Sequence, residues 1–389
     1  MISGNWKWFA GPVIVIVFSF IFILFVYFRN EKHGGVLNLI NEVEQNTDNI
    51  RQVGTENFKS GMSVKKESGN DLNIALISVM AGKKTIGFTD GKLNYALFGG
   101  VYGIAFAKNG DIYLADAGNN AIRKIMACGI VVTVSGDINV LKNDHMGKDA
   151  LNSPLGLAVD KKGNVFIAEY GGHRIIKIND KGRFVVFAGS GMNGLKDGWG
   201  IEAEFCNPRC VAIDDKDNLY VADEYNNSIR KITPGGLVST LAGSKSPGYA
   251  DGISSMAAFN RPYSIACGRD GNIYVADFMN DKIRKISAYG NVSTMELKHR
   301  DLDKKYRLKS PCSLAFDDKQ NLYVSDLSEH RLKKIGNDGY ITAVNLKSDG
   351  AGENIVFSGD ISIAVNSNGE MIVSDSKLPQ IRKVVFKSR

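Results

Sequence analysis

Short runs of apolar residues alternate with turn-forming residues along most of the chain, and residues 260–286 show the pattern clearly. A small, apolar run at 264–267 is followed by an alternating run at 273–276, which stops at Asp277, and an apolar run returns at 283–286. Gly, Asn and Asp stand between these runs, where the chain must reverse. Because β-branched and aromatic residues favour strands, the stretch predicts a set of short antiparallel strands.

The same pattern occurs six times. The acid that ends the second strand of each copy recurs at spacings of 53, 54, 54, 49 and 49 residues: Asp116, Glu169, Asp223, Asp277, Asp326 and Asp375. A further β-rich run follows each of the first five copies, whereas the sixth copy reaches the end of the chain without one. A run of this kind at residues 74–80 precedes the first copy. We therefore predict an all-β ring of six sheets in which residues 74–80 complete the last sheet and hide its free edge.

The repeated letters resemble a known family. P-Y-S-I-A at 262–266, G-N-I-Y-V-A-D at 271–277 and I-R-K-I at 283–286 are similar to the NHL repeat. The resemblance covers about residues 73–386 in six copies, and it implies a six-bladed β-propeller over residues 72–389. The family includes binding, RNA-binding and amidating-lyase propellers, and propellers of related shape include calcium-dependent lactonases, so the repeat implies the fold and not one function.

An uncharged apolar run precedes the repeats. Residues 9–28 contain no charged side chain, and Trp6, Trp8 and Tyr27 lie at the two ends of the run. Twenty residues at about 1.5 Å each cover the roughly 30 Å hydrocarbon core of a bilayer, and aromatic rings favour its interfaces. Because no small-x-small cleavage site follows, we predict an uncleaved signal-anchor helix and a single-pass membrane protein.

The anchor sets the expected organisation of the chain. Residues 1–30 form the N-terminus and the transmembrane segment, and the polar residues 31–71 form a stalk with a possible short helix at 36–43. The flanking basic residues are nearly balanced on the two sides of the run, so the positive-inside rule gives a weak orientation signal. We expect the propeller to lie outside the cytoplasm and to be monomeric.

Composition adds little to this picture. The chain has 48 Lys and Arg against 41 Asp and Glu, a net charge of +7, which is compatible with an ordinary solvated surface, and we expect no nucleic-acid partner. Its five cysteines are dispersed and form no C-x-x-C. They predict buried free thiols in strands and leave one disulfide open. Five histidines share no ligand spacing, and His173 and His330 fall in equivalent hairpin turns, where a structural role is expected.

In five copies a basic residue follows the strand-ending acid seven positions later. Glu169 is the exception, because Ile176 stands at that position. Across a tight hairpin this spacing can bring the two charges together, and a pair repeated in this way is typical of a structural link inside each blade. The predicted pairs are Asp116 with Arg123, Asp223 with Arg230, Asp277 with Arg284, Asp326 with Lys333, and Asp375 with Arg382.

Function is sought where the copies differ. The residue before the Gly or Ser of each innermost strand varies, and so does the residue after each acid. By analogy with other propellers, the first of these positions lies near the mouth of the central channel. Aromatic anchors with an Arg are typical of binding surfaces. The sequence thus predicts a ligand or partner face, with ordinary surface variation as the alternative, made of Tyr102, Tyr170, Arg209, Glu224, Tyr263 and Phe278.

No catalytic set and no metal-ligand set is evident, so we expect no catalytic residue, no metal ligand and no cofactor, although a divalent cation in the channel stays open. The principal hypothesis is a membrane-tethered binding, scaffolding or sensor module that takes a protein, a small molecule or a glycan on one face of the ring. The alternative is a hydrolase or lyase, of the lactonase or amidating-lyase kind, with a central metal. RNA binding is the third possibility, and it would require a basic, aromatic face.

Overall fold

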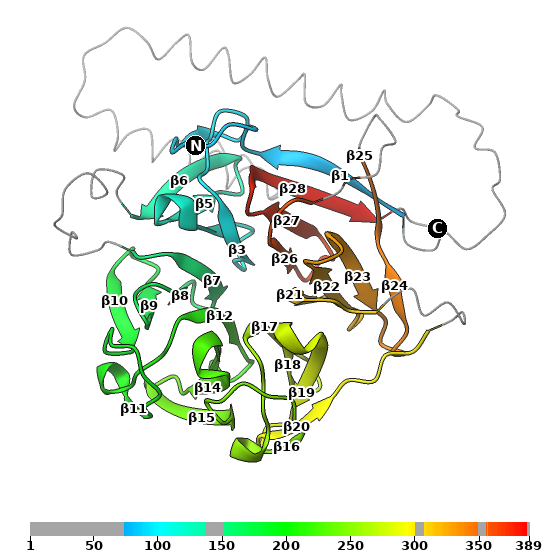
Figure 1. Cartoon of the computed structure of the whole chain (residues 1–389). Coiled ribbons are helices and arrows are strands. Elements are labelled where there is room, and N and C mark those ends of the chain that lie inside the picture. Colours follow the sequence, from blue (N-terminus) through cyan, green and yellow to red (C-terminus); the bar gives the residue numbers. More distant parts are fainter. Residues whose placement is uncertain (1–73, 137–150, 300–306, 349–354, 356, 387–389) are drawn as a thin grey trace, which may run out of the picture. The chain divides into compact units, whose positions relative to one another are not determined.

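The computed structural model describes residues 74–136, 151–299, 307–348, 355 and 357–386. They belong to one compact unit, residues 71–389. The described strands form six sheets, and the innermost strands of neighbouring sheets contact one another all the way around a ring (Figure 1). An all-β, six-bladed propeller is therefore present, as the sequence predicted.

The first three strands of each blade follow one another in meander order. The innermost strands are β3 (Val101–Phe106), β7 (Pro154–Val159), β12 (Pro208–Ile213), β17 (Pro262–Cys267), β21 (Pro311–Phe316) and β26 (Ile361–Val365). The second strands are β4 (Ile112–Asp116), β8 (Val165–Glu169), β13 (Leu219–Asp223), β18 (Ile273–Asp277), β22 (Leu322–Asp326) and β27 (Met371–Asp375). The third strands are β5 (Ala121–Ile125), β9 (Arg174–Ile178), β14 (Ser228–Ile232), β19 (Lys282–Ile286), β23 (Arg331–Ile335) and β28 (Leu378–Phe386).

The ring closes through the first described strand. β1 (Ile74–Ala81) pairs antiparallel with β28, with Ile77 opposite Val384, so the sixth blade receives its fourth strand from the start of the domain (Figure 1). The other fourth strands are β6 (Ile130–Ser135), β10 (Phe184–Ala188), β15 (Leu237–Gly243), β20 (Asn291–Thr294) and β24 (Ile341–Ala343). The predicted fourth strand at 340–346 differs from the structure, because the chain leaves blade five after β24 and β25 (Asn345–Ser348) runs parallel to β1 of blade six.

Short segments cover the outer edges of three more blades. β2 (Gly91–Lys92), β11 (Gly198–Trp199) and β16 (Gly252–Ile253) each pair with the fourth strand of the next blade. An aspartate precedes each of them: Asp90, Asp197 and Asp251. Each of these carboxylates accepts hydrogen bonds from a threonine on that fourth strand and pairs with the buried arginine of the same blade. In blades one, three and four, the incoming segment is therefore bound to the outer strand and to the buried arginine of the same blade.

Four of the predicted acid–base pairs form inside the blades. Their N–O distances are 3.0, 2.9, 2.8 and 2.7 Å for Asp116–Arg123, Asp223–Arg230, Asp277–Arg284 and Asp326–Lys333, and both side chains of every pair are fully buried. Burial raises the pKa of Asp223 to about 6, while Arg230 and three hydrogen bonds favour the charged form. In blade two, Glu169 pairs with Arg174 from the start of β9 instead of a cation seven residues away.

The fifth predicted pair does not form among the described residues. Asp375 accepts hydrogen bonds from the backbone and hydroxyl of Ser358 and from the backbone of Lys377, while Arg382 donates to Gln380 and leaves Nη1 without a partner. The cause lies in the hairpin. Asp375 pairs with a residue three positions later, whereas the acid pairs five positions later in the other blades, and the register then shifts. Burial lowers the pKa of the unpaired Arg382.

A turn residue links each of four blades to the next one. Its side chain accepts a hydrogen bond from the backbone N–H that precedes the next innermost strand: Asn120 from Ser153, His173 from Asn207, Asn227 from Arg261, and Asp281 from Ser310. All four acceptors have a positive φ, between 47° and 58°. Asn and Asp tolerate this left-handed conformation, and His takes the same role in blade two through Nδ1.

Replacing His173 tests this link. His173→Gly is expected to lower the free energy of unfolding by about 1–3 kcal/mol, because the Asn207 N–H loses its acceptor while glycine keeps the backbone relaxed at positive φ. His173→Asn should stay close to the wild type, since Asn120 and Asn227 make the same bond. Denaturant unfolding monitored by tryptophan fluorescence measures both. An equal loss in the two variants would show that it comes from other contacts of the His173 ring and not from the hydrogen bond to Asn207.

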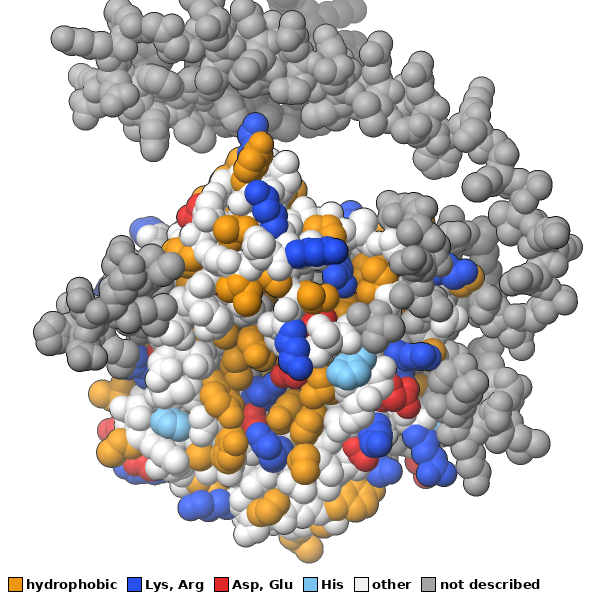
Figure 2. All heavy atoms as spheres, turned by 45° about the horizontal axis from the view of Figure 1, so that its top comes forward, with side chains coloured by type: hydrophobic (Ala, Val, Ile, Leu, Met, Phe, Trp, Pro, Cys, Tyr) orange, Lys and Arg blue, Asp and Glu red, His pale blue; other side chains and the backbone are white. Residues whose placement is uncertain are grey.

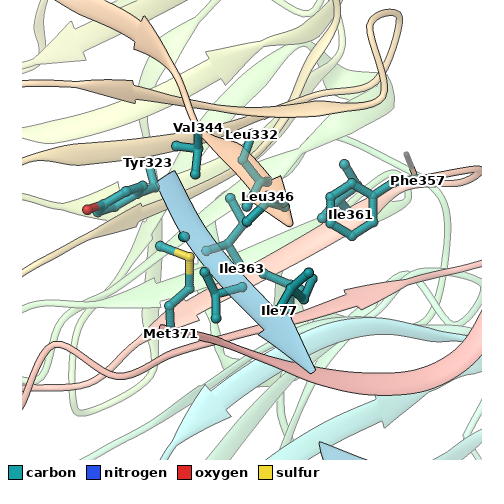
Figure 3. Close-up of a cluster of buried hydrophobic side chains, with 12 residues drawn as sticks. Ile77, Tyr323, Leu332, Val344, Leu346, Phe357, Ile361, Ile363 and Met371 are labelled. Carbon is teal, nitrogen blue, oxygen red and sulfur yellow. The ribbon is translucent and has the colours of Figure 1, made fainter. Parts of the chain in front are cut away.

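The core lies between the blades. One cluster joins blades five and six and contains Ile77 from the closing strand, with Tyr323, Leu332, Val344, Leu346 and Phe357 around it (Figure 3). Similar clusters fill the other interfaces, so each blade is stabilised by apolar burial against its neighbours rather than inside one sheet. Among the described residues, none of the helices is long and apolar enough to span a membrane. The predicted anchor at 9–28, like the segments 1–30 and 31–71, lies outside the described residues.

Candidate functional site

The innermost strands approach one another closely around the channel. A Cβ atom on Gly103 would lie 2.1 Å from the Leu155 carbonyl oxygen, and one on Gly156 would lie 2.6 Å from Cα of Cys210. This crowding explains the glycine at this position of β3 and β7. One residue earlier, five of the six strands have a register shift against the second strand, and β26 pairs without it. The residues at this position line the end of the channel.

A cavity of about 110 Å³ opens at this end of the ring. Tyr102, Arg209, Tyr263, Cys312 and Asp360 line its mouth. Six apolar side chains, one from each innermost strand, lie two residues further along the strands than Tyr102 and its equivalents. We call them the floor of the cavity: Ile104, Leu157, Val211, Ile265, Leu314 and Ile363. These floor residues are buried, so the cavity has its charged and polar side chains at one level and an apolar level two residues further along the strands.

An ion pair crosses the mouth. Nη2 of Arg209 in blade three lies 2.5 Å from Oδ2 of Asp360, which precedes β26 of blade six. The innermost strands follow one another in chain order around the ring, so these two blades face each other across the channel. The two residues are 151 positions apart in the sequence. This pair is the central polar feature of the site.

A buried glutamate holds the arginine in place. Glu224, the first residue of the short 3-10 helix η5 (Glu224–Asn226), is fully buried. Its Oε2 lies 3.4 Å from Nη1 of Arg209, and its Oε1 accepts from Nε and Nη2 of Arg261 at 2.8 and 2.5 Å. Burial disfavours the charge on Arg209, but Glu224 and Asp360 outweigh it and raise the pKa of this guanidinium. Two arginines and two carboxylates give the site no net charge.

An aromatic stack supports the same arginine. The rings of Tyr263 and Phe278 are parallel within 6°, with centroids 3.8 Å apart, and the Arg209 guanidinium lies 3.8 Å from the Tyr263 centroid. Phe278 opens the 3-10 helix η7 (Phe278–Asn280). Such stacking is favourable for a planar cation. Tyr263 is therefore a support for Arg209, and burial raises the pKa of its phenol.

Two further tyrosines lie beside this charged group, next to Arg261 and outside the lining of the cavity. Tyr170 meets Tyr225 edge-on, with ring centroids 6.5 Å apart, and Arg261 lies over the Tyr225 ring and donates to its hydroxyl at 3.3 Å. Burial, together with the nearby Glu224 charge, raises the pKa of Tyr170. Tyr225 is 49% exposed and Tyr102 is 37% exposed, so these two rings are available to a ligand. Figure 2 shows acidic and basic side chains between hydrophobic ones near the middle of the described surface.

The structure brings most of the sequence-predicted face together. Arg209, Glu224, Tyr263 and Phe278 form one contacting group, Tyr102 lines the same cavity, and Tyr170 reaches the group through Tyr225 and Arg261. Their accessibility differs from the expected aromatic rim, because Tyr263 and Phe278 are buried against each other. They position the charged centre instead of lining an open pocket.

Sequence comparison among the repeats missed two charged members. Asp360 stands where four of the other five copies have proline: Pro154, Pro208, Pro262 and Pro311. Arg261 stands where the equivalent residues are Gly100, Ser153, Asn207, Ser310 and Gly359. Both are exceptions to the repeat, and they lie one and two positions before the residue that we compared. Comparing the copies at these two positions as well would have identified both residues.

Metal-binding and thiol chemistry have few candidates here. In the part of the chain that the structure describes, no group of three or more His, Cys, Asp and Glu side chains is placed to hold a metal ion. All five cysteines are free, and Cys128 is exposed, contrary to the expectation of burial for every thiol. Cys312 lies at the mouth, 3.1 Å from the Ser325 hydroxyl, and burial raises its pKa to about 11, which disfavours a reactive thiolate.

Comparison with known proteins agrees with the fold. The Teneurin NHL domain family matches residues 247–347, and the NHL repeat family matches residues 151–178 and 205–232. Teneurin-3 of Danio rerio is 29% identical over 227 residues, 50% of this chain and 8% of that protein. The probable peptidyl-alpha-hydroxyglycine alpha-amidating lyase pgal-1 of Caenorhabditis elegans is 27% identical over 207 residues, 49% of this chain and 56% of that protein. The chain thus spans less than two thirds of either relative.

A solved structure shows the same architecture. A structural genomics protein of unknown function from Bacteroides thetaiotaomicron superposes with a TM-score of 0.59 at 20% identity, over 80% of this chain and 76% of that one. At this identity the likeness concerns the fold alone. Together, the matches to the NHL repeat and the closed ring of six blades support membership of an NHL propeller family.

Proposed function

We propose that this protein is a binding module of the scaffold or sensor kind, which takes its ligand or partner at the mouth of the propeller channel and is tethered to a membrane through residues 9–28. One observation carries the binding role. Residues at which the repeats differ converge from all six blades on one cavity with a charged centre, with the exposed ring of Tyr102 in its lining and that of Tyr225 beside Arg261. Aromatic and arginine side chains around a hollow are typical of binding sites.

The exposed rings provide the test. Tyr102→Ala and Tyr225→Ala should each weaken partner binding by roughly tenfold, because an exposed aromatic anchor at a recognition site contributes about 1 kcal/mol or more. Tyr289→Ala is the matched control, since this ring is 91% exposed and lies in the β19–β20 turn. Affinity capture from extracts of the source cells, followed by quantitative mass spectrometry, should find a partner retained by the wild type and by Tyr289→Ala. A partner retained equally by all variants would contradict the assignment of this face.

A lyase of the amidating kind is the second candidate, and the similarity to pgal-1 favours it. Metal analysis of the purified domain, residues 71–389, separates the two hypotheses. An ion that stays bound at one equivalent through dialysis against a chelator would support the enzyme. RNA binding, the third possibility, predicts a salt-dependent mobility shift with single-stranded RNA, and the absence of a shift would remove it.

The membrane attachment and its orientation are part of the proposal. The uncharged run at 9–28 is long enough to span a bilayer, and we place the propeller outside the cytoplasm. Protease treatment of intact cells should then remove the propeller while internal proteins survive. Protection of the propeller until the cells are lysed would contradict the proposed orientation. Recovery of the full-length protein in the soluble fraction would contradict the proposed membrane anchor.

A further inference from the structure

We infer that the channel mouth binds a small zwitterion, a molecule of amino-acid size with a carboxylate and an ammonium group close together, which inserts between Arg209 and Asp360. This inference rests on the proposed binding role of the mouth and deepens it by giving the ligand a chemical class. It depends on the position of the ion pair, on what holds each partner, and on the shape of the cavity.

The ion pair is placed where no structural link of the blades requires it. The links inside and between blades are repeated around the ring, whereas Arg209 and Asp360 both depart from the repeat and meet from opposite blades. Both side chains are partly accessible, at 15% and 25%, while the buried acid–base pairs of the blades are at 0%. A charged pair at the surface of a hollow can be reached and separated by a ligand.

The two partners differ in how firmly they are held. Arg209 is fixed by the Tyr263 ring and by Glu224, as well as by Asp360. Asp360 uses only Oδ2 in the pair, and within the described residues its Oδ1 receives no hydrogen bond. The arginine is thus a preorganised anion site, and the aspartate is the partner that can turn to meet a cation.

Charge balance then selects the ligand. A simple anion could replace Asp360 on Arg209 but would leave the displaced carboxylate beside it, and a simple cation would leave Arg209 with one acceptor fewer. A zwitterion exchanges one ion pair for two and leaves neither group unpaired, which matters because an unpaired, partly buried charge is costly. The site as a whole is neutral, so it has no excess field that would favour an ion of either sign.

The cavity agrees with a ligand of this size. Its volume is about 110 Å³, and beside the charged pair it is lined by six apolar side chains, one from each blade. Tyr102, which is 37% exposed on blade one next to blade six, can cover the body of the ligand. The mouth therefore fits a compact molecule with both charges at one end and a small apolar part.

Thermal unfolding of the purified full chain with millimolar free amino acids tests the inference. Glycine and alanine are the first probes, and acetate, methylammonium and an equimolar mixture of the two are the matched controls, because they carry the same groups unlinked. The expected result is a saturable rise of the melting temperature with at least one amino acid and none with the separate ions, since a ligand that binds only the native state stabilises it. No saturable rise with any of the twenty amino acids would overturn the inference.

Variants connect the shift to the ion pair. Asp360→Asn should abolish the amino-acid shift, and Arg209→Lys should weaken binding by about tenfold, because lysine lacks the planar fork that meets Glu224 and a ligand carboxylate together. Asp215→Asn is the control, since Asp215 forms an exposed pair with Lys161 near the far end of β12. A shift that persists in Asp360→Asn would refute the proposed site. If no shift occurs but Tyr102→Ala still loses its partner, the binding face stands and only the ligand class is wrong.

Discussion

Replacing Arg284 by alanine is expected to lower the free energy of unfolding by about 3–5 kcal/mol, because it leaves the fully buried Asp277 carboxylate without its cation. Arg284 also donates to Asp251 at 2.6 Å and to the carbonyl oxygens of Ala258 and Ala250. Its guanidinium lies over the rings of Tyr249 and Phe259. One residue thus connects the second strand, the outer edge and the incoming segment of blade four, and chemical denaturation of the domain measures its loss.

The chain supplies two controls for this experiment. Arg284→Lys should lose roughly half as much, because Lys333 holds the equivalent acid in blade five, but a lysine cannot also reach the aspartate at the outer edge. Lys285→Ala removes the neighbouring pair with Asp270, whose side chains are 38% and 41% exposed, and should cost less than about 1 kcal/mol. Similar losses for Arg284→Ala and Lys285→Ala would show that the buried pair contributes no more to the free energy of unfolding than an exposed pair does.

Replacing Ile77 by aspartate is expected to prevent stable closure of the ring, with a loss of more than about 4 kcal/mol, because it places a charge in the apolar cluster between blades five and six. Ile77 is 2% exposed, and it lies on the strand that completes blade six (Figure 3). Without β1, the N–H and C=O groups of β28 would be left as an open edge, which favours association with other chains. Melting temperature and size-exclusion chromatography together report the unfolding and the expected aggregation.

Val79 provides the matched control, since it lies on the same strand and is 52% exposed. Val79→Asp should change the free energy of unfolding by no more than about 0.5 kcal/mol. If Ile77→Asp remained monomeric and melted like Val79→Asp, the ring would be closed by interactions other than the packing of β1.

The repeat made the fold predictable. Each copy forms its strands and turns from local preferences. The last copy has no β-rich run after it, whereas the first copy has one before it at 74–80, so the run at 74–80 was expected to pair with the last copy, as it does. The acid–base spacing predicted four buried pairs correctly, because a regular hairpin fixes which residues face each other. It was wrong for Asp375 and Arg382, since the hairpin of blade six is shorter and gives Asp375 backbone donors nearby.

The residues of the candidate site were partly visible in the sequence, since Arg209 and Glu224 depart from the repeat. The contacts between these residues could not be predicted from the sequence. Whether Tyr263 is an exposed ring or a buried support depends on Phe278 and Arg209 on either side of it, and a pattern of alternating residues contains no information on such stacking.

The sequence by itself determined the blades, their number, the closing strand and the places where the copies differ, because these follow from local preferences repeated at regular intervals. The tertiary structure alone decided which of the differences meet. Arg209 and Asp360 are 151 residues apart, and they come within 2.5 Å only because six blades complete a ring and place blades three and six opposite each other. Ring closure is a property of the whole domain, and no single repeat contains it.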